Sequence, residues 1–183
     1  MLPLAFNLVD RPVLVIGAGA VGAGKARLLV EAGARVTVIA REVLVALPAG
    51  IVTLEERPYR DGDLTPFVVC VAATGDSVVN DVIGREARRT RTWLNVVDDP
   101  ARSDFFFTAV HRDGDVIVSV STQGASPALA QEIRTMIRER LPSNLGAVAA
   151  QLRAERDATH ARGESTEGHS WRPRIEELLD NER

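Results

Sequence analysis

The sequence predicts an α/β protein: a Rossmann-type, doubly wound parallel sheet followed by a β-hairpin/helix region and a small C-terminal helical region. Three observations predict this fold class. A glycine-rich turn lies between two apolar runs near the start of the chain, further apolar runs alternate with a helical pattern, and an Asp-Gly hairpin signal follows. The expected boundaries are 1–103 for the sheet domain, 104–141 for the hairpin and its helix, and 142–183 for the last region with its polar linker.

The first apolar run, Val13–Ile16, leads directly into the turn GAGAVG, residues 17–22. A helical pattern follows, and a second apolar run, Val36–Ala40, comes after it. The residues expected on the inner face of this helix are Val21, Leu28 and Leu29. Strand, glycine turn, helix and strand at these distances form the βαβ unit with G-x-G-x-x-G that binds dinucleotides.

Each glycine of the turn has a mechanical role in such a unit. Gly17 allows the tight turn, Gly19 lets a pyrophosphate approach the backbone, and Gly22 lets the helix lie close to the sheet. The helix N-terminus supplies N–H donors and partial positive charge to the phosphates. The expected cofactor-binding residues of this turn are Gly17, Gly19, Ala20, Val21 and Gly22. A tight turn that binds nothing is the alternative.

The end of the second strand leaves the choice between NAD and NADP open. An acidic residue that binds the adenosine ribose is expected there, about 20 residues after the turn. The chain has Ala40-Arg41-Glu42 at this place, so that Arg41 favours a 2′-phosphate and Glu42 lies one position late. Ala40 and Arg41 are the expected cofactor contacts.

The remaining elements of the sheet domain follow from apolar runs and turn residues. They are a short helix or turn over Glu42–Ala49, a strand over Ile51–Leu54, a loop over Pro58–Pro66, a strand over Phe67–Ala73, a helix capped by Asp76 or Ser77 and reaching about Arg91, and a strand over Trp93–Val97.

The second half of the chain changes pattern. Strands are expected over Asp104–His111 and Asp115–Ser121, and Ser126 caps a helix that reaches about Arg140. A further helix to about Asp157, a polar linker over residues 158–170 and a short amphipathic helix over 171–179 complete the chain. Because a hairpin and a few helices bury little core, packing in a homodimer is the simplest expectation, and packing on the first domain is the alternative.

Ligands of open α/β sheets bind beyond the carboxyl ends of the strands. Three segments should therefore converge: Gly17–Gly22, Thr74–Asp76 and Asn95–Asp99. The further cofactor contacts expected from them are Thr74, Gly75, Asn95 and Val96. Asp98 should face the nicotinamide end, where it is either catalytic or the start of a turn, and Asp99 is expected to be a surface turn residue.

Composition excludes several functions. A net charge of −3 argues against general affinity for nucleic acid, and no apolar run is long enough to span a membrane. Cys70 is the only cysteine, which favours a reducing compartment, the cytoplasm. The spacing of His111, His160 and His169 fits no metal site.

Four segments in order, LPLAFNLVDRPVLVIGAGAVGAGKARLLVEAGARVTVIA, VAATGDSVVN, NVVDDPARSDFFFTAV and VSVSTQGASPALAQEIR, cover residues 2–141 approximately. They resemble the siroheme synthase family of precorrin-2 dehydrogenases, some of which also insert Fe²⁺ into sirohydrochlorin. The resemblance implies NAD as cofactor, precorrin-2 as substrate and a homodimer with a dimerisation region. It also implies that Asp98 is catalytic and that Ser121, Thr122, Gln123 and Gly124 line the tetrapyrrole site.

Arg102 and Arg112 are candidates by position to bind the carboxylates of such a substrate. The chain departs from the family pattern at Gly22, Thr108 and Gln123, and the segment after Leu141 matches poorly. A non-catalytic NAD-sensing Rossmann module is the main rival, and an ordinary dehydrogenase of a small alcohol or acid is a weaker one. The first rival gives no reason for NVVDDP or GASPALA, and for the second no Ser/Tyr/Lys or His/Asp set is evident.

Overall fold

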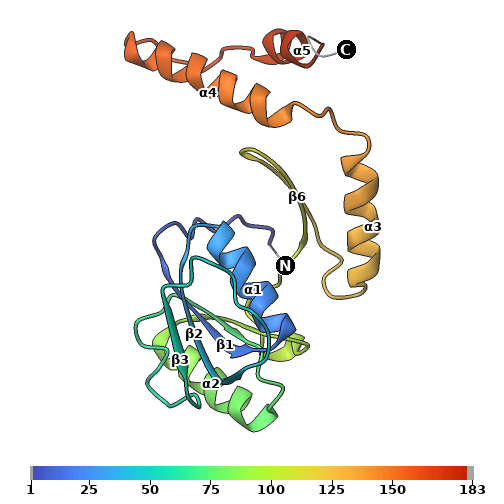
Figure 1. Ribbon diagram of the computed structural model, residues 1–183. Coiled ribbons are helices and arrows are strands. Elements are labelled where there is room, and N and C mark those ends of the chain that lie inside the picture. Colours follow the sequence, from blue (N-terminus) through green and yellow to red (C-terminus); the bar gives the residue numbers. More distant parts are fainter. Residues whose placement is uncertain (1, 181–183) are drawn as a thin grey trace. The chain divides into compact units, whose positions relative to one another are not determined.

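The computed structural model describes residues 2–180, and the chain forms two compact units, residues 1–106 and 107–183 (Figure 1). Met1 and residues 181–183, the ends of the expected first and last regions, lie outside the described residues. The expected division after residues 103 and 141 stays a prediction, and the structure places the hairpin and the C-terminal helices in one unit.

The first unit is a five-stranded parallel sheet in the order β3-β2-β1-β4-β5. Its elements are β1 (Pro12–Ala18), α1 (Ala20–Glu31), β2 (Arg35–Val43), β3 (Thr53–Glu56), β4 (Val69–Ala72), α2 (Ser77–Thr90), β5 (Trp93–Val96) and the short 3₁₀ helix η1 (Pro100–Arg102). The crossovers through α1 and α2 run in opposite directions from the centre of the sheet. Because such crossovers are right-handed, the two helices cover opposite faces. The doubly wound sheet is thus confirmed.

The predicted helix or turn over Glu42–Ala49 is wrong at its start, because β2 continues to Val43. The pairing of β1 with β2 shifts register after Ile16, so that Ala18 pairs with Val43, and the Leu44 N–H donates to the Ala18 carbonyl at 3.1 Å. This backbone pairing keeps the segment extended beside the glycine turn. The next strand, β3, begins at Thr53, two residues later than expected.

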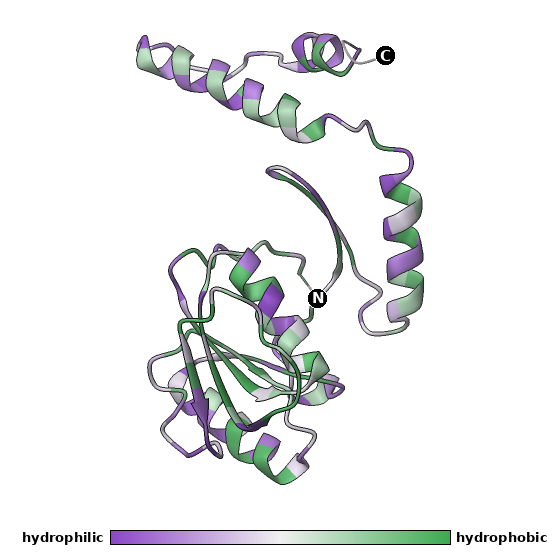
Figure 2. Ribbon diagram, in the orientation of Figure 1, coloured by the Kyte–Doolittle hydropathy of each residue, from purple (hydrophilic) through white to green (hydrophobic). Residues whose placement is uncertain are grey.

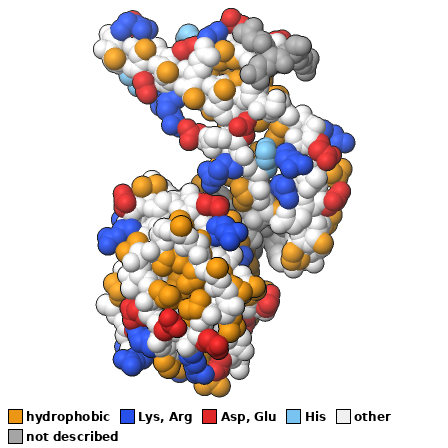
Figure 3. Space-filling model, viewed as in Figure 1, with side chains coloured by type: hydrophobic (Ala, Val, Ile, Leu, Met, Phe, Trp, Pro, Cys, Tyr) orange, Lys and Arg blue, Asp and Glu red, His pale blue; other side chains and the backbone are white. Residues whose placement is uncertain are grey.

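The inner face of α1 also differs from the prediction. Its buried residues are Gly22, Ala23, Ala26 and Leu29. Val21 and Leu28 are 51% and 48% exposed instead. Small side chains occupy the inner stripe because the helix lies close to the sheet, which turns the larger residues outward. Figure 3 shows hydrophobic side chains at the surface of this unit, with charged side chains around them.

The segment after η1 runs along the free edge of β5. The Asp104 carboxylate accepts from the Leu94 N–H at 2.9 Å, and the Asp104 N–H donates to the Leu94 carbonyl at 2.7 Å. The strand expected over Asp104–His111 therefore begins only at Ala109, because the start of that segment is engaged with β5.

The second unit contains the expected hairpin, β6 (Ala109–Asp113) and β7 (Val116–Val120), packed against α3 (Pro127–Arg138). Ser126 caps α3 by accepting from the Leu129 N–H at 3.2 Å, as predicted. Two further helices follow, α4 (Leu145–Ala161) and α5 (Arg172–Asp180). Since α4 continues to Ala161, the predicted linker over residues 158–170 is helical at its start. Figure 2 shows hydrophobic and hydrophilic residues interleaved around α3.

Candidate functional site

The carboxyl ends of β1, β4 and β5 meet at one edge of the sheet. The register pairs Ile16 with Ala72 and Ala72 with Val96, and the backbone pairing continues one residue further on each side. The glycine turn, the segment after β4 and the segment after β5 therefore lie together at this edge.

The glycine turn has the geometry expected of a phosphate-binding loop. Gly17 has a φ of 105°, and a side chain there would clash with the Ala73 carbonyl. A side chain on Gly22 would clash with the Gly17 carbonyl, so this glycine is required for the close approach of α1. Gly19 faces open space: among the described residues, only the Leu44 Cδ1 atom lies within 4 Å of its added Cβ, at 3.9 Å.

The N-terminus of α1 is open to an anion. Its N-cap residue is Gly19, which offers no side chain, and the first turn carries no acidic residue. The N–H groups at Ala20 and Val21 thus have the partial positive charge of a helix start, and open space lies beside the preceding Gly19. These features fit the pyrophosphate of a dinucleotide.

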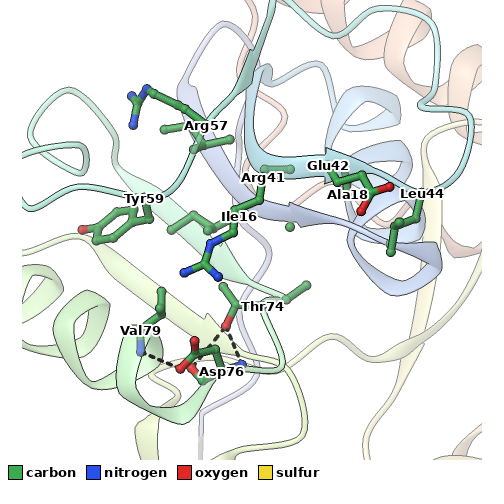
Figure 4. A pocket seen from close by; sticks show the side chains of 15 residues that line it. Ile16, Ala18, Arg41, Glu42, Leu44, Arg57, Tyr59, Thr74, Asp76 and Val79 are labelled. Atoms are coloured by element: carbon green, nitrogen blue, oxygen red, sulfur yellow. Dashed lines mark hydrogen bonds between the residues drawn. The ribbon is translucent and has the colours of Figure 1, made fainter.

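A pocket of about 280 Å³ lies beside this turn, within the first unit (Figure 4). Five of the expected cofactor contacts line it: Gly17, Gly19, Ala40, Arg41 and Thr74. The others expected, which do not line it, are Ala20, Val21, Gly22, Gly75, Asn95 and Val96. In Figure 4 the Arg41 side chain extends toward Thr74 and Asp76.

Several lining residues were not expected from the sequence, among them two with long polar side chains, Arg57 and Tyr59. They come from the segment after β3, which looks like an ordinary turn-rich loop. Asp63 accepts from the Arg57 guanidinium at 2.7 and 2.9 Å, and Glu55 accepts at 2.7 Å. The Asp63 hydrogen bonds and then those of Glu55 raise the pKa of Arg57 despite its partial burial. The charge of this arginine is therefore already paired with two carboxylates, that of Glu55 on β3 and that of Asp63 in the loop after it.

The start of α2 closes the pocket on the other side. The Asp76 carboxylate accepts from the N–H groups of Val78 and Val79 at 3.0 and 3.1 Å, which makes Asp76 the N-cap. The Thr74 hydroxyl donates to Asn80 at 2.7 Å and accepts from the Asp76 N–H at 3.1 Å. Thr74 thus holds the turn that carries the cap.

Asp98 lies two residues after the end of β5, in an exposed turn, and has a φ of 60°. A half-buried lysine of α1, Lys25, lies near enough to interact with it electrostatically. Burial lowers the pKa of Lys25, and the Asp98 carboxylate opposes this shift. The Asp98 carboxylate therefore acts electrostatically on the ammonium group of Lys25.

Arg102 is held within the same loop. Its guanidinium pairs with Asp99, and it lies 2.7 Å from the Asp81 carboxylate of α2. Asp99 caps η1, and the hydrogen bond from Arg102 lowers the pKa of Asp99. Two carboxylates therefore already bind the Arg102 guanidinium, and its expected role as a substrate contact stays a prediction.

Asn95 and Val96 point inward. They are 7% and 2% exposed, and the Asn95 amide donates to the Phe105 carbonyl at 2.9 Å. Neither side chain therefore points out of the carboxyl end of the sheet, although both residues were expected to contact the cofactor.

The residues expected to line the tetrapyrrole site form the turn between β7 and α3 in the second unit. The Ser121 hydroxyl accepts from the Gln123 N–H at 3.1 Å, and the Thr122 hydroxyl is bound to both backbone groups of Ser126. Gln123 and Gly124 have φ values of 55° and 85°. Arg112 is exposed on β6.

The glycine turn and the pocket beside it lie within residues 4–109, the part of the chain that matches the model of a family described as putative NAD(P)-binding. The chain belongs to this NAD(P)-binding family. The expected cofactor is thereby confirmed as a nicotinamide dinucleotide, and the open glycine turn fits that class.

Curated relatives extend the likeness beyond the family model. The chain is 41% identical over 152 residues to the siroheme synthase of Methylococcus capsulatus, covering 81% of this chain and 32% of that protein. It is 39% identical over 160 residues to the siroheme synthase of Salmonella arizonae, covering 84% of this chain and 35% of that protein. The chain thus spans about a third of the length of these relatives.

The fold has a solved counterpart in SirC, precorrin-2 dehydrogenase. The TM-score is 0.70 at 22% identity, and the match covers 99% of this chain and 88% of that one. This likeness confirms the fold class over both units. The resemblance to siroheme synthases is confirmed by sequence identity.

Two further observations concern function classes. No helix within residues 2–180 is long and apolar enough to cross a membrane. In the same part of the chain, no three His, Cys, Asp or Glu side chains are grouped closely enough to hold a metal ion.

Proposed function

We propose that the chain is an NAD-dependent dehydrogenase that oxidises precorrin-2 to sirohydrochlorin in siroheme biosynthesis. The observation that carries this proposal is the position of Asp98 at the same sheet edge as an open glycine turn, in a chain 41% identical to a siroheme synthase. A carboxylate beside a dinucleotide site is the minimum that such an oxidation needs.

Cofactor binding and proton transfer are assigned to different residues. NAD⁺, when bound, accepts the hydride that leaves the reduced macrocycle. The N–H groups at the start of α1 bind the pyrophosphate and fix its position, with Gly19 allowing the approach. Asp98 accepts the proton that leaves with the hydride, so that two electrons and two hydrogens are removed in all.

NAD⁺ is the proposed cofactor in preference to NADP⁺. Glu42 lines the pocket on β2 and would repel a 2′-phosphate, whereas Arg41 would attract it. The resemblance to NAD-dependent enzymes favours the first effect. Calorimetry with both dinucleotides tests the choice, and tighter binding of NADP⁺ would overturn it.

The substrate site and the second activity belong to the same proposal. The turn Ser121–Gly124 and the exposed Arg112 are proposed to contact the carboxylate-rich tetrapyrrole. Insertion of Fe²⁺ into sirohydrochlorin is proposed as a second reaction, in which Fe²⁺ is a substrate and Asp98 removes pyrrole protons. A cytoplasmic location, predicted from the lone Cys70, stays a prediction.

The experiment is anaerobic incubation of precorrin-2 with NAD⁺, followed by the absorbance of sirohydrochlorin and NADH. Formation of both in equal amounts is expected. Binding of NAD⁺ without any turnover would contradict the proposal and favour the NAD-sensing alternative. Addition of Fe²⁺ to the product, with and without the protein, tests the second reaction separately.

A further inference from the structure

The loop after β3 is attached to the body of the first unit by a buried carboxylate. Glu86, on α2, is 1% exposed. Its Oε1 atom accepts from the N–H groups of Gly62 and Leu64 at 2.9 and 3.1 Å, and its Oε2 atom accepts from the Tyr59 hydroxyl. The Arg89 guanidinium lies 3.9 Å from Oε1.

A buried carboxylate is a costly way to hold a loop. An ionised group loses its hydration when it is buried, and hydrogen bonds only offset that loss. Connecting β3 to β4 requires no such group. We therefore expect the position in which the carboxylate holds the loop to matter for function. One of its three hydrogen-bond partners is a residue of the pocket.

Tyr59 is that residue. Its ring packs against the hydrophobic core on one side and lines the pocket on the other (Figure 4). The hydroxyl is directed to Glu86, so the ring can flip about its own axis but cannot swing away from the pocket without losing that hydrogen bond. The ring is thus a fixed apolar wall of the pocket.

The same pocket is bounded by Ile39, Ala40 and Arg41, in the C-terminal half of β2. In dinucleotide-binding sheets the end of the second strand meets the adenosine ribose. Tyr59 therefore lies at the adenosine side of the proposed cofactor site, and Asp98, beyond β5, lies at the other side of the central strands.

We propose that Tyr59 contacts the adenosine of the cofactor and that Glu86 is a positioning residue that holds the Tyr59 ring in place for this contact. The inference rests on the proposed binding of NAD⁺ in this pocket. It assigns a cofactor-binding role to a loop that lies outside the glycine motif.

The test measures the affinity of the purified full chain for NAD⁺ and for ADP-ribose by calorimetry. Tyr59→Leu should weaken both ligands by about tenfold, the effect of losing one aromatic contact to a base. ADP-ribose should lose as much as NAD⁺, because the ring contacts only the shared adenosine half. Tyr59→Phe keeps the ring and loses the Glu86 hydrogen bond, and should cost about threefold.

Two variants of Glu86 separate positioning from simple stabilisation. In Glu86→Gln the amide oxygen can accept from both backbone N–H groups while the amide nitrogen donates to the Tyr59 oxygen, so affinity should stay within about threefold. Glu86→Leu removes all three hydrogen bonds and should weaken ADP-ribose by about tenfold. Asp61→Asn is the matched control, because it breaks an exposed ion pair between the same loop and Arg89. It should leave both affinities unchanged.

Urea unfolding of each variant identifies any that do not fold, and Tyr59→Phe and Glu86→Gln keep the test decisive in that case. Unchanged ADP-ribose affinity in folded Tyr59→Leu would overturn the inference and leave the proposed function standing. Tyr59-dependent binding of ADP-ribose by a protein that does not oxidise precorrin-2 would support the inference and contradict the proposed function.

Discussion

Asp98 is the residue on which the proposed chemistry depends, and its backbone occupies the left-handed region at a φ of 60°. Asparagine tolerates this conformation and has the same shape. Asp98→Asn should therefore fold and bind NAD⁺ normally, while the rate of precorrin-2 oxidation falls by about 10²–10⁴-fold, the usual effect of losing a general base.

Single-turnover absorbance measures this rate, and Asp99→Asn is the matched control. Asp99 caps η1 and pairs with Arg102, so its replacement should affect stability more than rate. If Fe²⁺ insertion is present and uses the same carboxylate, both rates should fall together in Asp98→Asn. Full dehydrogenase activity in a folded Asp98→Asn protein would remove this residue from the mechanism.

Gly19 permits a sharper test of the cofactor site than its two neighbours in the motif. Its φ is −82°, and open space lies beside it, so a side chain there should not disturb the fold. Gly19→Asp should weaken NAD⁺ by at least about a hundredfold, because a carboxylate then faces the pyrophosphate at close range. Calorimetry measures the loss, and Gly19→Ala, which adds no charge, should lose less. Equal losses in the two variants would contradict an electrostatic cause.

Ionisation of Tyr59 makes the stability of the first unit depend on pH in the alkaline range. Burial, and then the Glu86 carboxylate, raise the pKa of Tyr59 above its ordinary value of about 10. The folded state thus keeps the phenol proton where the unfolded chain loses it, so this contribution to stability is full below about pH 10 and declines above it. Tyr59 is the only tyrosine, so tyrosinate absorbance reports on it alone. Ionisation near pH 10 in the folded protein would contradict the prediction.

At the scale of elements, the N-terminus of α4 is capped by Asp113, at the tip of the β6–β7 hairpin, and not by its own N-cap residue, Asn144. The Asn144 side chain donates to the Leu178 carbonyl, while the Asp113 carboxylate accepts from the Gly146 N–H at 2.9 Å, at the start of α4. Gly146 is also needed for this contact, since an added Cβ would lie 2.7 Å from Asp113 Oδ1.

Asp113→Ala should lower the free energy of unfolding by about 1 kcal/mol, the usual cost of losing a cap. Gly146→Ala should also destabilise the protein, although alanine is favoured over glycine inside helices by about 1 kcal/mol. Urea unfolding checks both. Asp115→Asn, on the same hairpin, breaks only an exposed ion pair with Arg153 and serves as the control. A stabilising Gly146→Ala would show that the hairpin tip and α4 are not in contact.

At the scale of the whole molecule, the second unit exposes apolar side chains on both of its layers. Val110 and Ile117, on the outer face of the hairpin, are 45% and 48% exposed, and Leu129 of α3 is 52% exposed. A two-stranded sheet with one helix against it is a small core, and a second copy would cover these side chains. We propose that the chain forms a homodimer through this hairpin and α3.

Light scattering at micromolar concentration should give the mass of a dimer. Ile117→Asp should shift it toward the monomer, because the charge would be buried at the interface but is exposed in the single chain. Val78→Asp, in the first unit at a residue that is 71% exposed, is the control and should leave the mass unchanged. A monomeric mass for the unaltered chain would contradict the proposal.

Local patterns in the sequence determined the doubly wound sheet, the glycine turn and the cap at Ser126, and they narrowed the cap of α2 to Asp76 or Ser77, of which the structure has Asp76. These features depend on residues that are close along the chain: apolar runs, small residues at fixed spacing, and a capping side chain two or three positions before the N–H it accepts from. The predicted end of β2 and the predicted start of β6 were wrong. Backbone hydrogen bonds with residues far away in the sequence, Ala18 and Leu94, decide where these segments are extended or engaged.

Only the tertiary structure decided which charged side chains are free to act. Arg102 looked available to a substrate, but Asp81, which binds it, is 21 residues away on α2. Tyr59 looked like part of an ordinary loop, and its partner Glu86 is 27 residues away. The reason is physical: a long charged or aromatic side chain finds its partner across space, and the sequence carries no periodic pattern for such pairs. The amino-acid sequence therefore determined where the glycine turn lies, and tertiary packing decided which side chains line the pocket beside it.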